Sequence, residues 1–272
     1  MSTLEDAGVG FLEELAEQIG REEFRDPATR LDSLDSLERL DVLDWLAERG
    51  VALELEALAA APTTGTLRDL YVAAGAAANG AEAAPPSEPH ANGSGGILRS
   101  RFFQLEPINP EVLQYLYQLA ISSDVGYRWR FRGAVPDFPT FESTFWQGSL
   151  AQLVAIDLHT EMPAGHVVCY NPDPGQGYAY LGAVFGPEHI GDGRSVDAVR
   201  CFVRYVFTTW SFRKLYMEVP GFNHPQISSG EGVWFDVEGR LRGHDYYAGR
   251  WWDHYTLAVY RRHVGLPDLD HG

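Results

Sequence analysis

The chain of 272 residues has few cysteines and no long apolar run. Its two cysteines, Cys169 and Cys201, do not stand in a metal-ligand spacing such as C-x₂-C. With no basic-then-apolar leader, this scarcity predicts a cytoplasmic protein. No apolar stretch approaches the roughly 18 residues that a membrane span needs. We therefore expect no metal site and no membrane segment.

Basic side chains are also scarce. There are 21 Lys and Arg against 38 Asp and Glu, which gives a formal net charge of −17. This balance argues against binding to nucleic acid, whose phosphates require clustered Lys and Arg, and against docking on anionic membranes. The first 80 residues alone carry 17 acidic and 6 basic side chains, a net −11. An acidic region of this kind suits docking to basic rims on partner enzymes.

Large apolar side chains are missing from residues 76–96, which read AAANGAEAAPPSEPHANGSGG. A segment of this composition cannot offset the entropy cost of ordering its backbone, so it predicts a flexible linker. The chain therefore divides into an N-terminal domain at 1–77, a linker at 78–98 and a C-terminal domain at 99–265.

Helical spacing dominates the N-terminal domain. Apolar residues recur every three or four positions over 11–19 and stop at Gly20, which indicates a helix end. A second helix is predicted from Ser36, with Asp35 or Ser36 as its N-cap, and it ends at Gly50. Threonines precede a last short helix at 67–74. The sequence thus predicts a small bundle of three or four helices.

The C-terminal domain shows mixed periodicity. Alternating strand and helix signals predict an α+β or mixed α/β domain with a largely antiparallel sheet and flanking helices. The expected strands are 101–105, 150–157, 165–170, 178–185, 214–219 and a hairpin over 240–260, and the expected helices are 110–121, 141–146 and 193–210.

One triplet in the first domain points to a covalent arm. In LDSLDSLERLDVLDWLAERG, the sequence Asp35-Ser36-Leu37 begins an acidic amphipathic helix, where the helix dipole favours an attached phosphodiester. The triplet alone is equally a capping sequence. Its surrounding register, with the threonine turn and TLRDLY, resembles the acyl carrier proteins over most of 8–75. This resemblance implies a 4'-phosphopantetheine on Ser36, attached by a separate transferase. Placing Ser33 in the same slot would put Arg39 where the helix needs an apolar residue.

A glycine-containing turn precedes the long helix of the second domain. Gly191 and Gly193 allow a ligand to approach the backbone, and the free amides of the helix start suit a pyrophosphate. Many glycine turns precede helices without binding anything.

The whole segment at 100–262 resembles the GCN5-related N-acetyltransferases (GNAT), in the branch that includes ribosomal-protein and spermidine acetyltransferases. The resemblance rests on the FFQLEPINPEVLQYLYQL opening, the strands around YLGAVFGP, and the RKLYMEVPGFN and WWDHYTLAVY segments. The family's pyrophosphate loop, Q/R-x-x-G-x-G/A, reads Glu188 to Gly193 here. Both of its glycines match, but Glu188 stands at the first position, and Arg194 would balance part of that charge.

The GNAT resemblance also implies catalytic roles. The family's amines attack a thioester directly, with a base for the ammonium proton, an acid for the thiolate and a backbone amide for the carbonyl. That amide is expected near Val184, and Asn223 is expected to help hold the cofactor. The base candidates are Glu218 and His224, and the acid candidates are Ser228 and Ser229, since the segment lacks the usual Tyr. Each of these side chains can equally be an ordinary loop or strand residue.

Together these features predict a carrier–GNAT fusion acyltransferase of natural-product biosynthesis. Its donor would be acetyl-CoA or another acyl thioester, and its acceptor a small-molecule amine. Its protein partners would be the phosphopantetheinyl transferase and an acyl-loading enzyme or other carrier proteins. The arm is either donor or acceptor. Two alternatives remain, a non-catalytic carrier and docking protein and a GNAT-fold decarboxylase of a carrier-bound acyl group.

Overall fold

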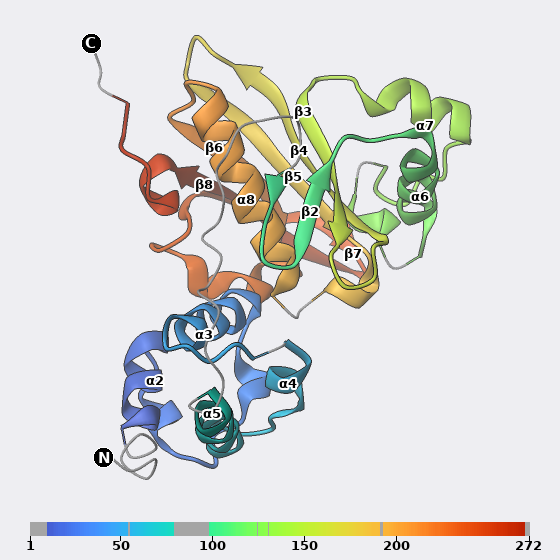
Figure 1. The fold of residues 1–272 in the computed structure, drawn as a ribbon. Helices are drawn as coiled ribbons and strands as arrows, with labels where there is room; N and C mark the ends of the chain where they lie inside the picture. Colours follow the sequence, from blue (N-terminus) through green and yellow to red (C-terminus); the bar gives the residue numbers. More distant parts are fainter. Residues whose placement is uncertain are drawn as a thin grey trace. The chain divides into compact units, whose positions relative to one another are not determined.

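The computed structural model describes residues 10–53, 55–78, 98–123, 125–129, 131–190 and 193–269. These form two compact units, one built from the helices before residue 79 and the other from the elements that follow residue 97 (Figure 1). The predicted linker at 78–98 overlaps the last residue of one helix and the first residue of a strand, and 79–97 lie outside the described residues. Among the described residues, every helix is too short or too polar to cross a bilayer.

The first unit is helical. Phe11 joins three of its helices, with its ring 5.3 Å from Trp45 and 4.8 Å from Tyr71. Gly20 takes a left-handed conformation (φ 74°) at the end of the first of these helices, as the sequence predicted. The elements are α2 (Phe11–Ile19), η1 (Glu22–Arg25), η2 (Leu31–Ser33), α3 (Ser36–Glu48), α4 (Leu55–Ala60) and α5 (Thr64–Ala78).

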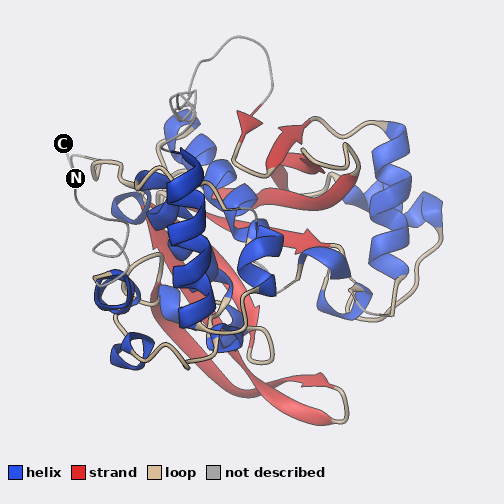
Figure 2. Cartoon of the chain, turned by 60° about the horizontal axis from the view of Figure 1, so that its bottom comes forward, coloured by secondary structure: helices blue, strands red, loops and turns tan. Residues whose placement is uncertain are grey.

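The second unit is built on one sheet of eight strands in the order β1-β2-β3-β4-β5-β6-β8-β7. Every neighbouring pair is antiparallel except β5 and β6. β7 and β8 form a long hairpin, visible among the strands of Figure 2. The strands are β1 (Leu98–Arg99), β2 (Phe103–Glu106), β3 (Ser149–Asp157), β4 (Pro163–Asp173), β5 (Tyr178–Phe185), β6 (Lys214–Pro220), β7 (Asp236–Tyr247) and β8 (Arg250–Tyr260).

Helices pack on this sheet. α6 and α7 cover the sheet face that carries Val154 and Val184, both of which are buried against helix and loop side chains. α8 packs against β1, β2 and β4. The helical elements are α6 (Pro110–Ile121), η3 (Gly126–Arg128), α7 (Phe138–Phe145), η4 (Pro187–His189), α8 (Arg194–Thr209), η5 (His224–Gln226), η6 (Ser228–Gly230) and η7 (Arg261–Val264).

Candidate functional site

The parallel strands β5 and β6 separate before either of them ends. Their pairing runs from Tyr178–Lys214 to Leu181–Met217, whereas β5 continues to Phe185 and β6 to Pro220. We call the separated segments, residues 182–185 and 218–220, the β5–β6 fork. Along the fork, the β6-facing edge of β5 has no strand partner among the described residues. A central sheet strand therefore keeps backbone groups available for a ligand.

The hydrogen-bonding ladder decides which amides face the fork. Gly186 donates its N–H to the carbonyl oxygen of Ala164 beside β4 at 2.9 Å. Since amides alternate along a strand, the amide of Val184 also points toward β4. The amides of Ala183 and Phe185 then point toward the fork, and Ala183 is exposed although its strand is central. The amide of Val184 itself therefore points away from the fork, whereas the amides of its two neighbours point toward it.

The start of α8 follows the fork in the chain. Gly193 precedes it with a φ of +89°, a conformation that L side chains rarely adopt. Gly191 lies outside the described residues, so its role stays a prediction. Arg194 is the first residue of α8, and its Nη1 lies 3.7 Å from Oδ2 of Asp157 at the end of β3. Part of the Arg194 charge is therefore already balanced.

Asp157 is a fixed anion beside this helix start. Its side chain is buried, which works to raise its pKa. The backbone N–H groups of Thr160 and His159 donate to its Oδ1 at 3.0 and 2.8 Å, which works to lower the pKa. The charges of His189 and Arg194 lower it further, and together these effects outweigh burial. The pKa of Asp157 consequently lies below its ordinary value. An ionised Asp157 thus holds Arg194 at the start of α8.

Glu188, the departure from the GNAT loop pattern, has a side chain that is 60% exposed, 3.7 Å from Nε2 of His189. Its charge also reaches Tyr115 on α6: burial first, and Glu188 second, raise the pKa of Tyr115 to about 12. The Tyr115 hydroxyl is buried and makes no hydrogen bond to any described residue, while its ring packs against the cluster that contains Val184. The sequence analysis missed Tyr115, although a tyrosine on the apolar side of the predicted helix was a signal.

The predicted catalytic residues do not come together. Glu218 on β6 is exposed, and it pairs in the sheet with Thr256. His224 stacks on Tyr255 at 4.1 Å, and Tyr255 pairs with Val219. Because neighbouring positions of a strand face opposite sides of the sheet, Glu218 and His224 lie on opposite faces. They cannot act together on one proton.

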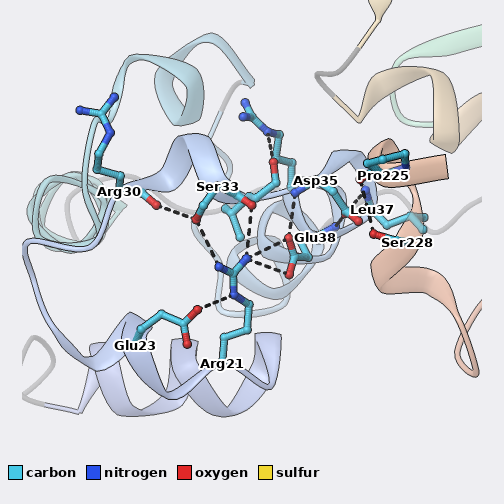
Figure 3. A network of polar contacts seen from close by, with 11 residues as sticks. Arg21, Glu23, Arg30, Ser33, Asp35, Leu37, Glu38, Pro225 and Ser228 are labelled. Carbon is cyan, nitrogen blue, oxygen red and sulfur yellow. Dashed lines mark hydrogen bonds and ion pairs between the residues drawn. The ribbon is translucent and has the colours of Figure 1, made fainter. Parts of the chain in front are cut away.

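The segment after β6 carries the remaining candidates. Ser228 and Ser229 are exposed in η6, and Oγ of Ser228 donates to the carbonyl of Pro225 at 3.5 Å (Figure 3). Asn223 precedes η5 and donates its N–H to Pro220 at the end of β6, at 2.8 Å. The Ser228 contact is at the long end of the hydrogen-bonding range. Asn223 lies just after the fork end of β6, and its role toward a cofactor stays a prediction.

In the first unit, Ser36 opens α3 beneath a complete capping box. Oδ1 of Asp35 accepts the N–H groups of Leu37 and Glu38, and Oε2 of Glu38 accepts the N–H of Asp35. Figure 3 shows this network together with Arg21, which reaches Glu38 and Ser33. The cap fixes where α3 begins and so places Ser36 in its first turn.

The two serines of the repeated Asp-Ser-Leu triplet differ. The Ser33 hydroxyl donates to the carbonyl of Arg30 at 3.0 Å and accepts from Nη2 of Arg21 at 3.4 Å. The Ser36 hydroxyl makes no hydrogen bond to any described residue. Of the two, Ser36 has the uncommitted hydroxyl.

No family model matches the chain. Over 90 residues it is 30% identical to an uncharacterized N-acetyltransferase, p20, from Bacillus licheniformis, an alignment that covers 33% of this chain and 51% of the relative. The chain thus spans about half the length of that curated relative.

Solved structures share the architecture of the second unit. The spermidine N-acetyltransferase from Vibrio cholerae, solved with CoA and spermine, superposes with a TM-score of 0.52 at 18% identity, over 60% of this chain and 97% of that one. A chimera of this enzyme with its human counterpart gives a TM-score of 0.51 at 18% identity, with the same coverage. The second unit has a GNAT fold, which confirms this part of the sequence prediction.

Proposed function

We propose that the chain is an N-acyltransferase that moves an acyl group from a thioester to an amine. The observation that carries the proposal is the β5–β6 fork, with the amides of Ala183 and Phe185 turned toward it. The two amides are two residues apart along β5, a spacing that suits hydrogen bonds to an extended pantetheine chain. One of them would donate to the thioester carbonyl oxygen as that oxygen gains negative charge. The start of α8 then suits the pyrophosphate of acetyl-CoA. CoA and spermine bound to the Vibrio cholerae enzyme of similar fold favour the same substrate classes.

In this reaction the amine nitrogen forms a bond to the thioester carbonyl carbon, and the carbon–sulfur bond breaks. Glu218 faces the side of the sheet covered by α6 and is the nearer of the two predicted bases to an acceptor entering there. Ser228 and Ser229 stay candidates for protonating the thiolate, directly or through water.

The test is acyl transfer by the full-length protein. Acetyl-CoA would be supplied with spermidine and a panel of other primary amines, and thiol release and acylated product would be measured together. We expect product formation that requires the protein. Absence of any acylated amine over the whole panel, with both CoA and carrier-bound donors, would contradict the proposal.

We further propose that the first unit is an acyl carrier domain armed on Ser36, within a natural-product pathway. The support is the resemblance of this segment and the uncommitted Ser36 hydroxyl beneath the Asp35 cap. The 4'-phosphopantetheine would be held covalently by Ser36, and it supplies a thiol that carries the acyl group as a thioester.

Intact mass tests this assignment directly. Protein treated with a phosphopantetheinyl transferase and CoA should gain the mass of one arm. Ser36→Ala should gain nothing, and Ser33→Ala, the matched control, should be modified like the wild type. Modification of Ser36→Ala would show that the arm is attached at another residue. An unmodified wild type would contradict the carrier assignment without affecting the acyl-transfer test.

A further inference from the structure

Two residues of the loop that follows η3, Trp129 and Arg132, contact strands on either side of the fork. We call them the bridging residues. Trp129 packs against the cluster of Val184 on β5, and its ring lies 5.6 Å from His166. Three residues later, Nη1 of Arg132 lies 3.2 Å from Oδ1 of Asp245 on β7. These two residues, three apart in the chain, thus contact strands on both sides of the fork.

One of the bridging residues, Arg132, has a strained backbone conformation. Arg132 has a φ of +48°, which is uncommon for a residue other than glycine. Its N–H donates to the carbonyl of Trp129 at 2.9 Å, which closes the turn between the two contacts. Strain of this kind persists where the surroundings over-determine the conformation, and it occurs often at functional sites.

Asp245, which contacts Arg132, also forms a buried carboxylate–imidazole pair with His254. Nδ1 of His254 lies 2.8 Å from Oδ2 of Asp245, and both residues are buried, at 5% and 7% exposure. The pair is brought together by an irregular register in the β7–β8 hairpin between Leu241 and Asp245, where Gly243 has a φ of +55°. Bulges of this kind re-aim side chains near active sites.

The pair leaves one imidazole nitrogen available. With Nδ1 directed at Asp245, Nε2 is the ring nitrogen of His254 that this contact leaves free to exchange a proton. A carboxylate on Nδ1 fixes the tautomer and stabilises the imidazolium that forms when Nε2 takes a proton. Arg132 contacts the other carboxylate oxygen and so helps to orient Asp245.

The sheet register places His254 on the acceptor side of the fork. His254 pairs with Pro220, the last residue of β6, and Thr256 pairs with Glu218. Since every second residue shares a face, His254 lies on the same face as Glu218. That face also carries Val184, which packs beneath Trp129. His254 therefore lies on β8, the strand next to β6, and on the sheet face that the bridging residues contact.

We propose that His254 is the general base of the reaction and that Asp245 is its positioning residue; this inference rests on the proposed function. Nε2 of His254 takes a proton from the ammonium of the acceptor, directly or through one water. The freed lone pair attacks the thioester carbonyl, the thiolate leaves and takes the second nitrogen proton, and His254 then returns its proton to water. One ammonium and one thioester thus give one amide, one thiol and one released proton.

A divalent cation is the competing explanation for this cluster. Nitrogen and oxygen atoms of His244, Asp245 and His254 all lie within 4.8 Å of one another, and the rings of the two histidines are 5.2 Å apart. The guanidinium of Arg132 argues against it, because it already occupies one oxygen of Asp245 with a positive charge. The charged and titratable groups near His254 are Asp245 and His244 from β7. Arg132 contacts Asp245, and Glu218 on β6 lies one pair further along the same face.

The test compares His254→Gln, Asp245→Asn and His244→Ala in the full-length protein, with acetyl-CoA and spermidine over a range of pH. A general base contributes roughly 10²- to 10⁴-fold, so we expect His254→Gln to lose about 100-fold in kcat/KM at neutral pH, mostly in kcat. The loss should shrink as the pH rises, because the amine then arrives uncharged. Added imidazole should partly restore His254→Ala, and Asp245→Glu should recover part of the loss in Asp245→Asn. His244→Ala should retain nearly full activity.

Each outcome decides the proposal. A constant loss in His254→Gln at every pH, together with no imidazole rescue of His254→Ala, would indicate a structural role and overturn it. Equal losses in all three variants, with a stoichiometric metal in the purified protein, would replace the base with a cation site. Wild-type activity with an unaffected His254→Gln removes His254 alone, whereas a wild type inactive with every donor and amine removes the proposed function as well.

Discussion

Asp35 and Glu38 exchange hydrogen bonds at the start of α3. The N–H of Asp35 donates to Oε2 of Glu38 at 2.8 Å, and the N–H of Glu38 donates to Oδ1 of Asp35 at 3.0 Å. Two amides that the helix itself cannot satisfy are thereby paired. This exchange fixes the residue at which α3 begins, and Ser36 is that residue.

Replacing Asp35 with Ala should loosen α3. Loss of an N-cap costs about 1 kcal/mol, which corresponds to roughly fivefold faster opening of the helix. Hydrogen–deuterium exchange of peptides that cover 34–48 measures this in the full-length protein. Asp35→Asn, which keeps an acceptor oxygen, should exchange nearly like the wild type. Unchanged exchange in Asp35→Ala would show that the cap contributes nothing here.

Removing the charge of Glu188 should tighten CoA binding. The side chain is exposed and follows the fork in the chain, so its charge repels a pyrophosphate bound near the start of α8. Exposed charges contribute modestly, and Glu188→Gln should lower the KM for acetyl-CoA by roughly threefold at low salt. Added salt should diminish the difference. Glu142→Gln, another exposed acid on α7, is the control and should leave the KM unchanged. A higher KM in Glu188→Gln would mean that the glutamate assists binding.

Tyr115→Phe should stabilise the protein. The Tyr115 hydroxyl is buried without a partner among the described residues, and such a group costs about 1–3 kcal/mol. We expect the free energy of unfolding to rise by about 1 kcal/mol in chemical denaturation. Tyr117→Phe, on the same helix, removes a hydroxyl that donates to the Pro136 carbonyl at 3.0 Å and should instead lower stability. Destabilisation by Tyr115→Phe would point to a partner in solution.

Lys214 and Glu238 should make stability depend on pH at both extremes. Nζ of Lys214 lies 2.8 Å from Oε2 of Glu238, which also accepts from the Tyr216 hydroxyl at 2.9 Å. Burial works to raise the pKa of Glu238, but hydrogen bonds from Lys214, Tyr260 and Tyr216 hold it below 4.5. Burial works to lower the pKa of Lys214, and its hydrogen bond to Glu238 holds it above 10.5.

The pair therefore stabilises the protein fully between pH 4.5 and pH 10.5, the ordinary pKa values of Glu238 and Lys214. This stabilisation disappears as the pH falls through the folded-state pKa of Glu238, and again as the pH rises through that of Lys214. Glu238→Gln should lower stability at neutral pH by about 1–2 kcal/mol and flatten the acid limb, as urea unfolding at several pH values would report. Asp236→Asn, from the more exposed pair with Arg262, should change little. An acid limb of equal slope in Glu238→Gln would exclude the pair as its cause.

Local signals in the chain were sufficient for many elements. Strand β5 and helix α6 lie at the residues predicted from apolar spacing, and Gly20 ends α2 as expected. α4 was not predicted, and α5 runs from Thr64 to Ala78 rather than over 67–74. Alanine-rich segments carry little periodic contrast, which explains both differences.

The sequence by itself determined the local elements, the acidic balance and the glycines before α8, because each depends on neighbouring residues along the chain. Only the tertiary structure decided which strand edge stays unpaired, that Glu218 and His224 lie on opposite faces, and that Asp245 meets His254. These relations depend on strand register, and an irregularity at Gly243 changes which side chains meet. Register is set by packing across the whole sheet, which the local pattern does not contain.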